Sequence, residues 1–479
     1  MKCNVEIYFY FIIWIISVLF SIYKFSSRAK EYFLDYNDEY NDFTEGITFL
    51  WSKRDKSDLE WESINYLLSY FFPWILVYVG VAQLFRCFIM SKEVLQIWEI
   101  SFTIIFILLQ LGYVSLFLLL LQPVLFYSVM CLRTETIYTW ICSCTSIALL
   151  NVYKSLNTQE DFQELLSLNT YESYLLTMAL FWLNLKCTSF FLVKPNSSNP
   201  LEFFSYCLYT PTLFTGPFIL YSDFQENFVK GPPKGFRKLA KNLMIILFWY
   251  VFGNVCLHFI YVNAASLQLQ LIESLDSWSL YGYGYTMGQF FHLKYVVLYG
   301  LSTSIASFEN IQVPNLPRCI GRIHLYSDMW KYFDPGLYTF LLRHIYIPSI
   351  TIFKNKSLSS LLCFCFIYVW HGLEKHILIW TALNFVGIII ESVLWPPSRK
   401  NVSKHTNHWE RRINCLLSAP LLAVSAISSF YFFAGKEVGD VFFRRIFTDE
   451  LDNTLILMLV LNCCCQVSTQ LRSTTARKM

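Results

Sequence analysis

WEISFTIIFILLQLGYVSLFLLLL, residues 98–121, carries a single charged side chain, that of Glu99. A helix that crosses the hydrocarbon core of a bilayer needs about 20 mostly apolar residues. The stretch is long enough, and it predicts a transmembrane helix. The rest of the chain has the same character, because 55% of its 479 residues are hydrophobic and 15% are charged. Average soluble proteins carry about 25% charged residues, so the composition predicts an integral membrane protein.

Similar apolar stretches recur along the whole chain. They predict an all-α polytopic membrane protein with roughly ten to twelve transmembrane helices, in which residues 1–479 form a single integral membrane domain. The predicted spans are 5–24, 66–90, 98–121, 122–132 joined to 136–153, 172–193, 236–262, 283–306, 337–353, 357–372, 374–395, 413–433 and 453–471.

Two stretches are too irregular to be plain spans. Residues 204–222, FSYCLYTPTLFTGPFILYS, contain Pro211 and Pro217, and residues 308–336 mix polar side chains, prolines and glycines with aromatic residues. Irregular backbone at membrane depth is tolerated only where protein or a water-filled cavity surrounds it. Both stretches are therefore predicted to be re-entrant or interfacial.

Two loops between predicted spans are basic. Loops of this kind beside transmembrane helices tend to face the cytosol, so we interpret both as topology signals. The alternative is electrostatic attraction of a phosphate-bearing cosubstrate. The clusters are Lys230, Lys234, Arg237, Lys238 and Lys241 in the first loop, and Arg399, Lys400, Lys404, Arg411 and Arg412 in the second.

The composition also excludes several classes of function. The 37 Lys and Arg residues against 34 Asp and Glu leave no basic domain that would bind nucleic acid. An aromatic content of 19% excludes an intrinsically disordered protein. The 15 cysteines show no paired metal-binding spacing, and many lie in apolar runs. We interpret most of them as small membrane hydrophobes, and we predict no metal site.

One histidine lies at the end of an apolar run. His371 closes LCFCFIYVWH, and Gly372 follows it. Ionisable side chains inside a membrane are rare and are functional candidates. Burial disfavours the charged imidazolium, so the ring is expected to be neutral and able to act as a general base. The alternative is a structural histidine whose ring hydrogen-bonds a backbone carbonyl.

A second group of ionisable residues precedes this run. Asp328 and Asp334 lie in an aromatic segment between Arg318 and Pro348. A carboxylate near a membrane cavity needs a partner, and Asp334 could meet His371 as the acid that orients a base. The residues alone leave two classes open: a membrane group-transfer enzyme, and a channel or transporter with an ion relay. Transporters often carry broken helices at corresponding positions in two halves, and this chain does not, which favours the enzyme.

Three ordered motifs are more specific than these single residues. NLPRCIGRIHLYSDMWKYFDPGLYTFLLRHIYIP spans 315–348, FCFIYVWHG spans 364–372, and FFAGKEVGDVFFRRIF spans 432–447. Together they resemble the Hedgehog acyltransferase branch of the membrane-bound O-acyltransferase (MBOAT) superfamily. The specific resemblance covers 204–222 and 283–446, and it identifies 283–446 as the catalytic core.

The resemblance implies a fold and an activity. The fold is an MBOAT-type helical bundle whose helices and re-entrant segments enclose a tunnel, in the endoplasmic reticulum membrane or the Golgi. The activity is transfer of palmitate from palmitoyl-CoA to the N-terminal cysteine amine of Hedgehog-type secreted proteins. The partners would be acyl-CoA, a Hedgehog precursor N-terminal peptide and the lipid bilayer. Two alternatives remain: an O-acyltransferase acting on a serine or a lipid hydroxyl, and a non-catalytic transporter or scaffold.

The resemblance also assigns roles to single residues. His371 is implied as the catalytic base, and Asp334 as the carboxylate that holds the imidazole or positions the amine. Trp330 is implied as a gate of the substrate tunnel, and Cys319 as a ligand of haem b. One departure concerns the last motif, where the family pattern Gly-Asn-Glu-Val-Gly has Lys436 in place of the asparagine. Lys436 is therefore not assigned a catalytic role.

Overall fold

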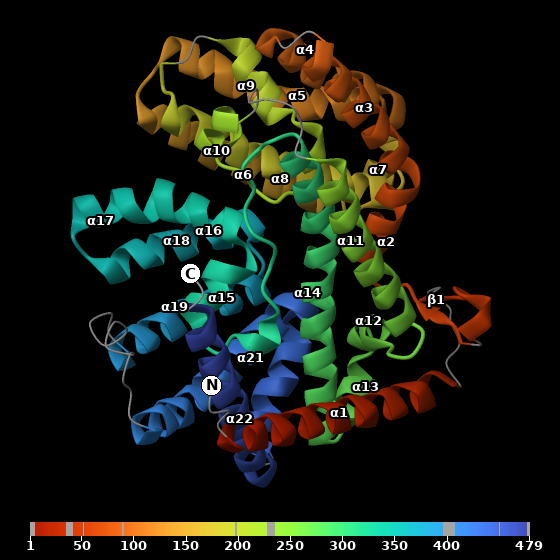
Figure 1. Cartoon of the computed structure of the whole chain (residues 1–479), viewed down its shortest axis with the longest axis vertical. Coiled ribbons are helices and arrows are strands. Elements are labelled where there is room, and N and C mark those ends of the chain that lie inside the picture. Colours follow the sequence, from red (N-terminus) through yellow and green to blue (C-terminus); the bar gives the residue numbers. More distant parts are fainter. Residues whose placement is uncertain are drawn as a thin grey trace.

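The computed structural model describes residues 5–34, 42–50, 52–88, 91–196, 199–227, 235–395, 408–449 and 451–476. Helices make up most of this part, as predicted for an all-α protein (Figure 1). Its only β-structure is a short antiparallel ribbon of β1 (Phe43–Thr44) and β2 (Arg54–Asp55).

The helices of the first half of the chain are α1 (Val5–Leu34), α2 (Leu59–Tyr66), α3 (Phe72–Phe88), α4 (Lys92–Gln110), α5 (Gly112–Leu132), α6 (Thr136–Leu156), α7 (Glu160–Leu166), α8 (Thr170–Val193), α9 (Pro200–Cys207) and α10 (Tyr221–Asn227). Those of the second half are α11 (Phe236–Cys256), α12 (Val262–Ser266), α13 (Leu269–Ser274), α14 (Ser277–Phe308), α15 (Tyr326–Phe333), α16 (Pro335–Leu341), α17 (Ile347–Phe353), α18 (Lys356–His371), α19 (Lys375–Leu394), α21 (His408–Arg444) and α22 (Leu451–Ala476).

In the described residues, nine helical stretches are long and apolar enough to cross a membrane. The prediction of a polytopic all-α membrane protein is thereby confirmed. Four predicted spans are not among the nine: α6 and α14 carry more polar residues, α18 has 16 residues, and 337–353 is divided between α16, a π-helix at Leu342–Tyr346 and α17. The total of roughly ten to twelve transmembrane helices stays a prediction.

The prediction of one span over 98–121 is wrong. The helical backbone is interrupted between α4 and α5, because Gly112 adopts a φ of 80°. Residues other than glycine rarely adopt a φ in this range. The predicted join of 122–132 to 136–153 is wrong as well. Residues 122–132 are the second half of α5, and the polar residues Arg133 and Glu135 separate it from α6.

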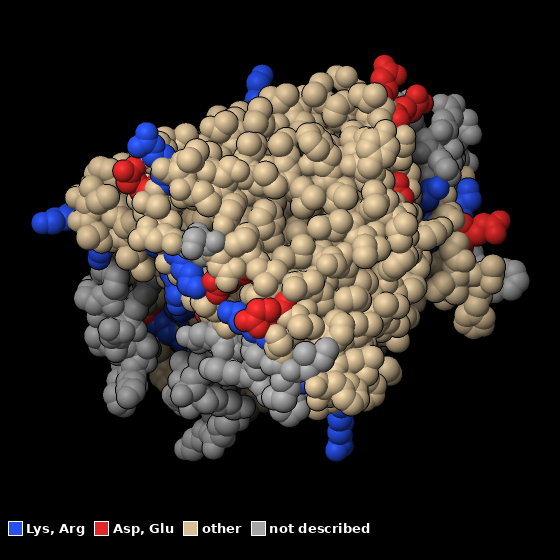
Figure 2. All heavy atoms as spheres, turned by 90° about the horizontal axis from the view of Figure 1, so that it is seen from above, with Lys and Arg blue, Asp and Glu red and all other residues tan. Residues whose placement is uncertain are grey.

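The outer surface is apolar where it is expected to face lipid. Figure 2 shows a broad face with few charged side chains, which gather at its rim. Large hydrophobic side chains on α3, α4 and α5 are exposed, including Leu84, Leu109, Tyr113, Phe117 and Leu125. Exposed apolar area of this extent is typical of a membrane-facing surface.

Part of the two basic loops can be located. Arg237, Lys238 and Lys241 are exposed at the start of α11. Arg411 and Arg412 lie near the start of α21, where both form ion pairs with Glu6 of α1. Lys230, Lys234, Arg399, Lys400 and Lys404 lie outside the described residues. The orientation of both loops stays a prediction.

Residues 204–222 form an irregular segment inside the protein. After α9 ends, a 3₁₀ turn at Thr210–Thr212 and a cis peptide bond before Pro217 carry the chain to α10, and residues 205–221 are buried. Hydroxyl groups satisfy part of this backbone: the Tyr206 hydroxyl donates to the Ile219 carbonyl at 2.7 Å. The Thr210 hydroxyl contacts that of Thr103 on α4 at 2.7 Å. The setting is the one in which membrane proteins tolerate irregular backbone. That the segment is re-entrant stays a prediction, as it does for 308–336.

A buried cluster of ionisable side chains lies beside this segment. The Glu309 carboxylate at the end of α14 accepts a hydrogen bond from the Tyr209 hydroxyl at 2.6 Å and lies 3.4 Å from the Arg86 guanidinium. The Tyr78 hydroxyl lies 2.5 Å from Oε1 of Glu99 and 3.3 Å from Oε2 of Glu309. These five residues, the Glu309 cluster, join α3, α4, α14 and the turn after α9.

α14 packs more extensively against α1 than against any other described helix. α14 runs down the middle of the molecule, with α1 across its lower end (Figure 1). A Cβ atom placed on Gly282 of α14 would lie 2.0 Å from the carbonyl oxygen of Ser21. The two backbones can therefore approach closely only because residue 282 has no side chain, as at small-residue helix interfaces in membranes.

We expect Gly282→Ala to separate α1 from α14 and to lower the free energy of unfolding by about 1–3 kcal/mol, the usual cost of overpacking. The measurement is thermal unfolding of the full chain in detergent micelles. Gly80→Ala is the matched control, because a Cβ on that helical glycine meets nothing within 4 Å. Equal melting temperatures for the two variants would contradict the prediction.

Candidate active site

His371 is the last residue of α18. Asn355, directly before the helix, caps it: its side chain accepts a hydrogen bond from the Leu358 amide at 3.1 Å. It ends at Gly372, which has a φ of 138°. His371 thus lies where helical backbone stops, and its ring projects from a fixed helix end.

Three aromatic rings surround the His371 imidazole. Trp370, Trp380 and Phe432 present their rings nearly at right angles to it, with centroids 4.8, 5.3 and 5.2 Å away. Within the described part of the chain, neither ring nitrogen has a hydrogen-bond partner, and the residue is partly exposed. A structural histidine would use its ring to bond a carbonyl, and this ring does not. Its nitrogens are available to a bound substrate.

Asp334 caps the helix that follows it. Its Oδ1 accepts a hydrogen bond from the Leu337 amide at 2.9 Å, and its Oδ2 accepts one from the Tyr299 hydroxyl at 2.7 Å. Neither of these partners is His371. Of the two roles implied for Asp334, holding the imidazole has no direct contact to support it. Positioning the amine is compatible with these hydrogen bonds, because each carboxylate oxygen can accept more than one.

Packed aromatic rings connect Asp334 to His371. The Trp182 ring lies 6.5 Å from Tyr299, the partner of Asp334, and 5.6 Å from Trp370, the neighbour of His371. Trp182 is buried on α8. The structure therefore brings the two predicted catalytic residues to one aromatic region without direct contact between them.

Trp330 lies one ring away from the histidine. Its centroid is 5.5 Å from that of Trp380, which in turn packs against His371. Its indole Nε1 donates a hydrogen bond to Oδ1 of Asn384 on α19 at 3.0 Å. A tryptophan held in this way can shield the imidazole, which is compatible with the gate implied by the resemblance.

Cys319 does not have the surroundings of a haem ligand. A haem thiolate needs an open face on which the iron can approach the sulfur. The Cys319 thiol instead donates to Oε1 of Gln289 at 3.5 Å. A Cβ placed on Gly321 would lie 3.3 Å from Gln289 Nε2 and from the Tyr285 hydroxyl, so polar side chains fill this region closely. We assign no step to haem.

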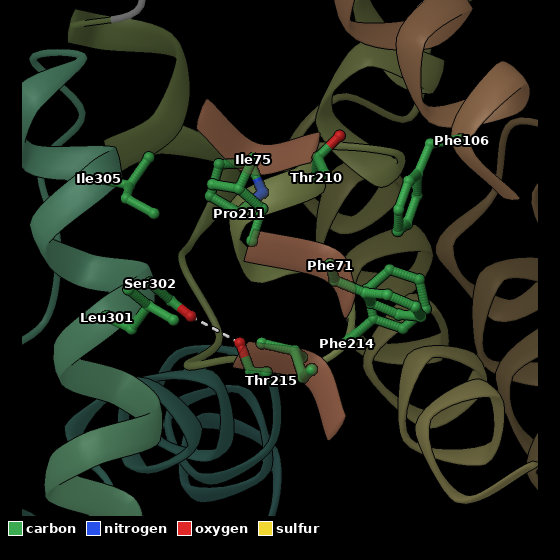
Figure 3. A pocket seen from close by; sticks show the side chains of 11 residues that line it. Phe71, Ile75, Phe106, Thr210, Pro211, Phe214, Thr215, Leu301, Ser302 and Ile305 are labelled. Atoms are coloured by element: carbon green, nitrogen blue, oxygen red, sulfur yellow. Dashed lines mark hydrogen bonds between the residues drawn. The ribbon is translucent and has the colours of Figure 1, made fainter. Parts of the chain in front are cut away.

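A small cavity lies away from these residues. It holds about 20 Å³, enough for about one water molecule. Figure 3 shows it between α14 and the irregular segment, with the Thr215 and Ser302 hydroxyls in contact at 2.5 Å. Neither His371 nor Asp334 lines it. We assign it no part in the candidate site.

Three charged or polar residues of this region were missed by the sequence analysis. Lys154 contacts the end of α18, Tyr299 contacts Asp334, and Lys294 pairs with two carboxylates of the α2 segment, Asp58 at 2.7 Å and Glu60 at 2.8 Å. A signal existed for Lys294, because it is a lone cation inside the predicted span 283–306. No local pattern marks Tyr299.

Lys436 has a partner of its own. It forms an ion pair with Asp440, one turn further along α21, and the Tyr431 hydroxyl donates to the same carboxyl group at 2.8 Å. Gly435 beside it interrupts the helix with a φ of 82°. These contacts explain Lys436 as a structural residue of a kinked helix.

Comparison with known proteins relates this chain to a family. The model of the membrane-bound O-acyltransferase family, MBOAT, matches residues 46–418. The chain is 28% identical to protein-cysteine N-palmitoyltransferase Rasp of Drosophila melanogaster, over 97% of this chain and 94% of the relative. It is 28% identical to protein-cysteine N-palmitoyltransferase HHAT of Mus musculus, over 70% of this chain and 72% of the relative.

A shorter similarity extends to yeast. The chain is 26% identical to membrane-bound O-acyltransferase GUP1 of Candida tropicalis, over 46% of this chain and 38% of the relative. The family match covers well over half of the chain and includes Trp330, Asp334 and His371. This chain therefore belongs to the membrane-bound O-acyltransferase family.

Proposed function

We propose that this protein transfers palmitate from palmitoyl-CoA to the N-terminal cysteine amine of Hedgehog-type secreted proteins. One observation carries the proposal. The His371 imidazole has no hydrogen-bond partner in the described structure, and it lies in a chain that is 28% identical to protein-cysteine N-palmitoyltransferase Rasp over 97% of its length. The peptide partner follows from the motifs of the catalytic core.

The reaction exchanges a thioester for an amide. The α-amine has an ordinary pKa of about 7.7–8.0, so a useful fraction is neutral near pH 7. Its nitrogen attacks the thioester carbonyl, and His371 accepts the proton that this nitrogen releases. The carbon–sulfur bond then breaks, and the imidazolium returns the proton to the CoA thiolate. Such proton transfer is typically worth 10²–10⁴-fold in rate.

Asp334 and Trp330 have supporting roles in this proposal. The Asp334 carboxylate accepts a hydrogen bond from the attacking amine and holds it near the thioester, since orientation supplies much of the rate of a two-substrate reaction. Trp330 acts as the gate of the substrate tunnel beside the His371 imidazole. No step of the proposal involves haem.

The membrane setting suits the acyl donor. Each buried CH₂ group gains about 0.8 kcal/mol, so a palmitoyl chain strongly prefers hydrocarbon. A site inside a polytopic membrane protein lets the palmitoyl chain remain in the hydrocarbon of the bilayer. We place the protein in the endoplasmic reticulum membrane, where secreted substrates pass, with the Golgi as the alternative.

The competing function is O-acylation of a serine or a lipid hydroxyl, which the similarity to GUP1 of Candida tropicalis favours.

We expect His371→Ala to lower acyl transfer by 10²–10⁴-fold, because the general base is lost. The assay gives the purified full chain palmitoyl-CoA and a Hedgehog N-terminal peptide, and mass spectrometry detects the amide, which resists hydroxylamine. His408→Gln is the control, because His408 is an exposed histidine at the start of α21. Full activity of His371→Ala would show that the mechanism is wrong.

Two modified peptides separate N-acylation from O-acylation. A peptide whose N-terminal cysteine is N-acetylated should not be acylated, because no amine remains to attack. A peptide that begins with N-acetylserine keeps its hydroxyl and should also be inert. Acylation of the N-acetylserine peptide would identify an O-acyltransferase instead.

We expect Tyr299→Phe to lower kcat/KM by about 10–100-fold, because a hydrogen bond to a charged group is worth about 1.5–3 kcal/mol. Loss of the hydroxyl frees the Asp334 carboxylate, so the effect should appear chiefly in the KM for the peptide. Tyr283→Phe is the matched control, since Tyr283 lies on the same helix and its hydroxyl meets Ser266 at 2.8 Å. Equal KM values for the peptide in both variants would contradict the assignment.

A further inference from the structure

The end of α18 is bound from outside by another helix. The last carbonyl groups of a helix have no partners within it. Here Nδ2 of Asn151 donates to the Val369 carbonyl at 2.9 Å, and Nζ of Lys154 donates to the His371 carbonyl at 3.1 Å. Both donors lie on α6, three residues apart and so on one face of that helix. Both bind the backbone of the last turn of α18, and Lys154 binds that of His371 itself, the residue proposed as the base.

Gly372 allows the Lys154 ammonium to come this close. A Cβ placed on Gly372 would lie 3.0 Å from Nζ of Lys154, and its φ of 138° is one that other residues rarely adopt. The ammonium is held from the other side by Oε1 of Glu374, at 3.0 Å. The Lys154 side chain is 39% exposed and that of Glu374 is 49% exposed. One partner of the ammonium is the carbonyl of His371, and the other is the carboxylate of Glu374, three residues further along the chain.

Charged and titratable side chains beside the end of α18 come from α6 and from the start of α19. α6 contributes Lys154, and the start of α19 contributes Glu374 and His376, whose Nε2 lies 3.3 Å from Oε2 of Glu374. The rings that touch the imidazole, those of Trp370, Trp380 and Phe432, are uncharged. A nearby ammonium disfavours the imidazolium, and a nearby carboxylate favours it.

We propose that Asn151 and Lys154 clamp the end of α18 and so act as positioning residues for His371. The inference rests on the proposed role of His371 as the base. The imidazole has aromatic contacts but no hydrogen bond in the described structure, so its direction depends on the backbone that carries it. The clamp fixes that backbone, and the Lys154 ammonium keeps the imidazole neutral and ready to accept a proton.

The first test replaces the ammonium. We expect Lys154→Met to lower kcat at least about tenfold with little change in either KM, because the base is misplaced while both substrates still bind. The acid limb of the kcat profile should move to higher pH, since the imidazolium is no longer opposed by a neighbouring cation. Lys154→Arg should restore both properties. Lys92→Met is the matched control, a lysine with 37% side-chain exposure that pairs with Glu202 on another part of the surface.

A second variant keeps the proposal testable if Lys154→Met fails to fold. Glu374→Gln removes the exposed carboxylate and leaves the Lys154 bond to the carbonyl, so the acid limb should move to lower pH. Unchanged kcat and pH profiles in both variants, while His371→Ala is inactive, would overturn the clamp and leave the proposed function standing. Full activity of His371→Ala would instead overturn the proposed base, and the clamp with it.

Discussion

The buried carboxylate of Glu309 constrains the rest of the structure. An unpaired charge in the interior is very costly, and removing one partner of a buried pair typically costs about 3–5 kcal/mol. Glu309 therefore has to keep the partners it has, Arg86, Tyr209 and Tyr78, and through Tyr78 it is linked to Glu99. These residues come from α3, α4 and the turn after α9. Since they must meet at the end of α14, the position of that helix is fixed by charge as well as by packing.

α14 carries this constraint to the candidate active site. Tyr299 lies on the same helix, and its hydroxyl fixes the Asp334 carboxylate. Five residues before Tyr299, near the middle of the helix, Lys294 binds Asp58 and Glu60 of the N-terminal part of the chain. A continuous helix moves as one unit, so the Asp334 environment depends on contacts made elsewhere along α14, at Lys294 and at Glu309. The irregular segment 204–222 is held against this helix by Thr215 and Ser302, which makes the buried unwound backbone part of the same arrangement.

The sequence predicted the class of fold and some of the site, for a physical reason. Apolar residues make ionisable groups expensive, so His371 is conspicuous in the sequence, and long apolar runs indicate most of the spans. Hydropathy averages side chains and does not detect backbone breaks, which is why the change of direction at Gly112 was missed. The partners of the site could not be found locally, because Tyr299 is 35 residues from Asp334 and Lys154 is 217 residues from His371. Only packing brings them together.

The separation of Asp334 from His371 suits an amine nucleophile. In Ser-His-Asp sites the carboxylate binds the imidazole, because a hydroxyl is a poor nucleophile until a well-oriented base removes its proton. An α-amine is partly neutral near pH 7 and already nucleophilic. The base then only has to accept the proton released during attack, and a helix end with surrounding aromatic rings can orient it for that task. The carboxylate is left to bind the amine, which we infer is why its fixed partner is the Tyr299 hydroxyl and not the imidazole.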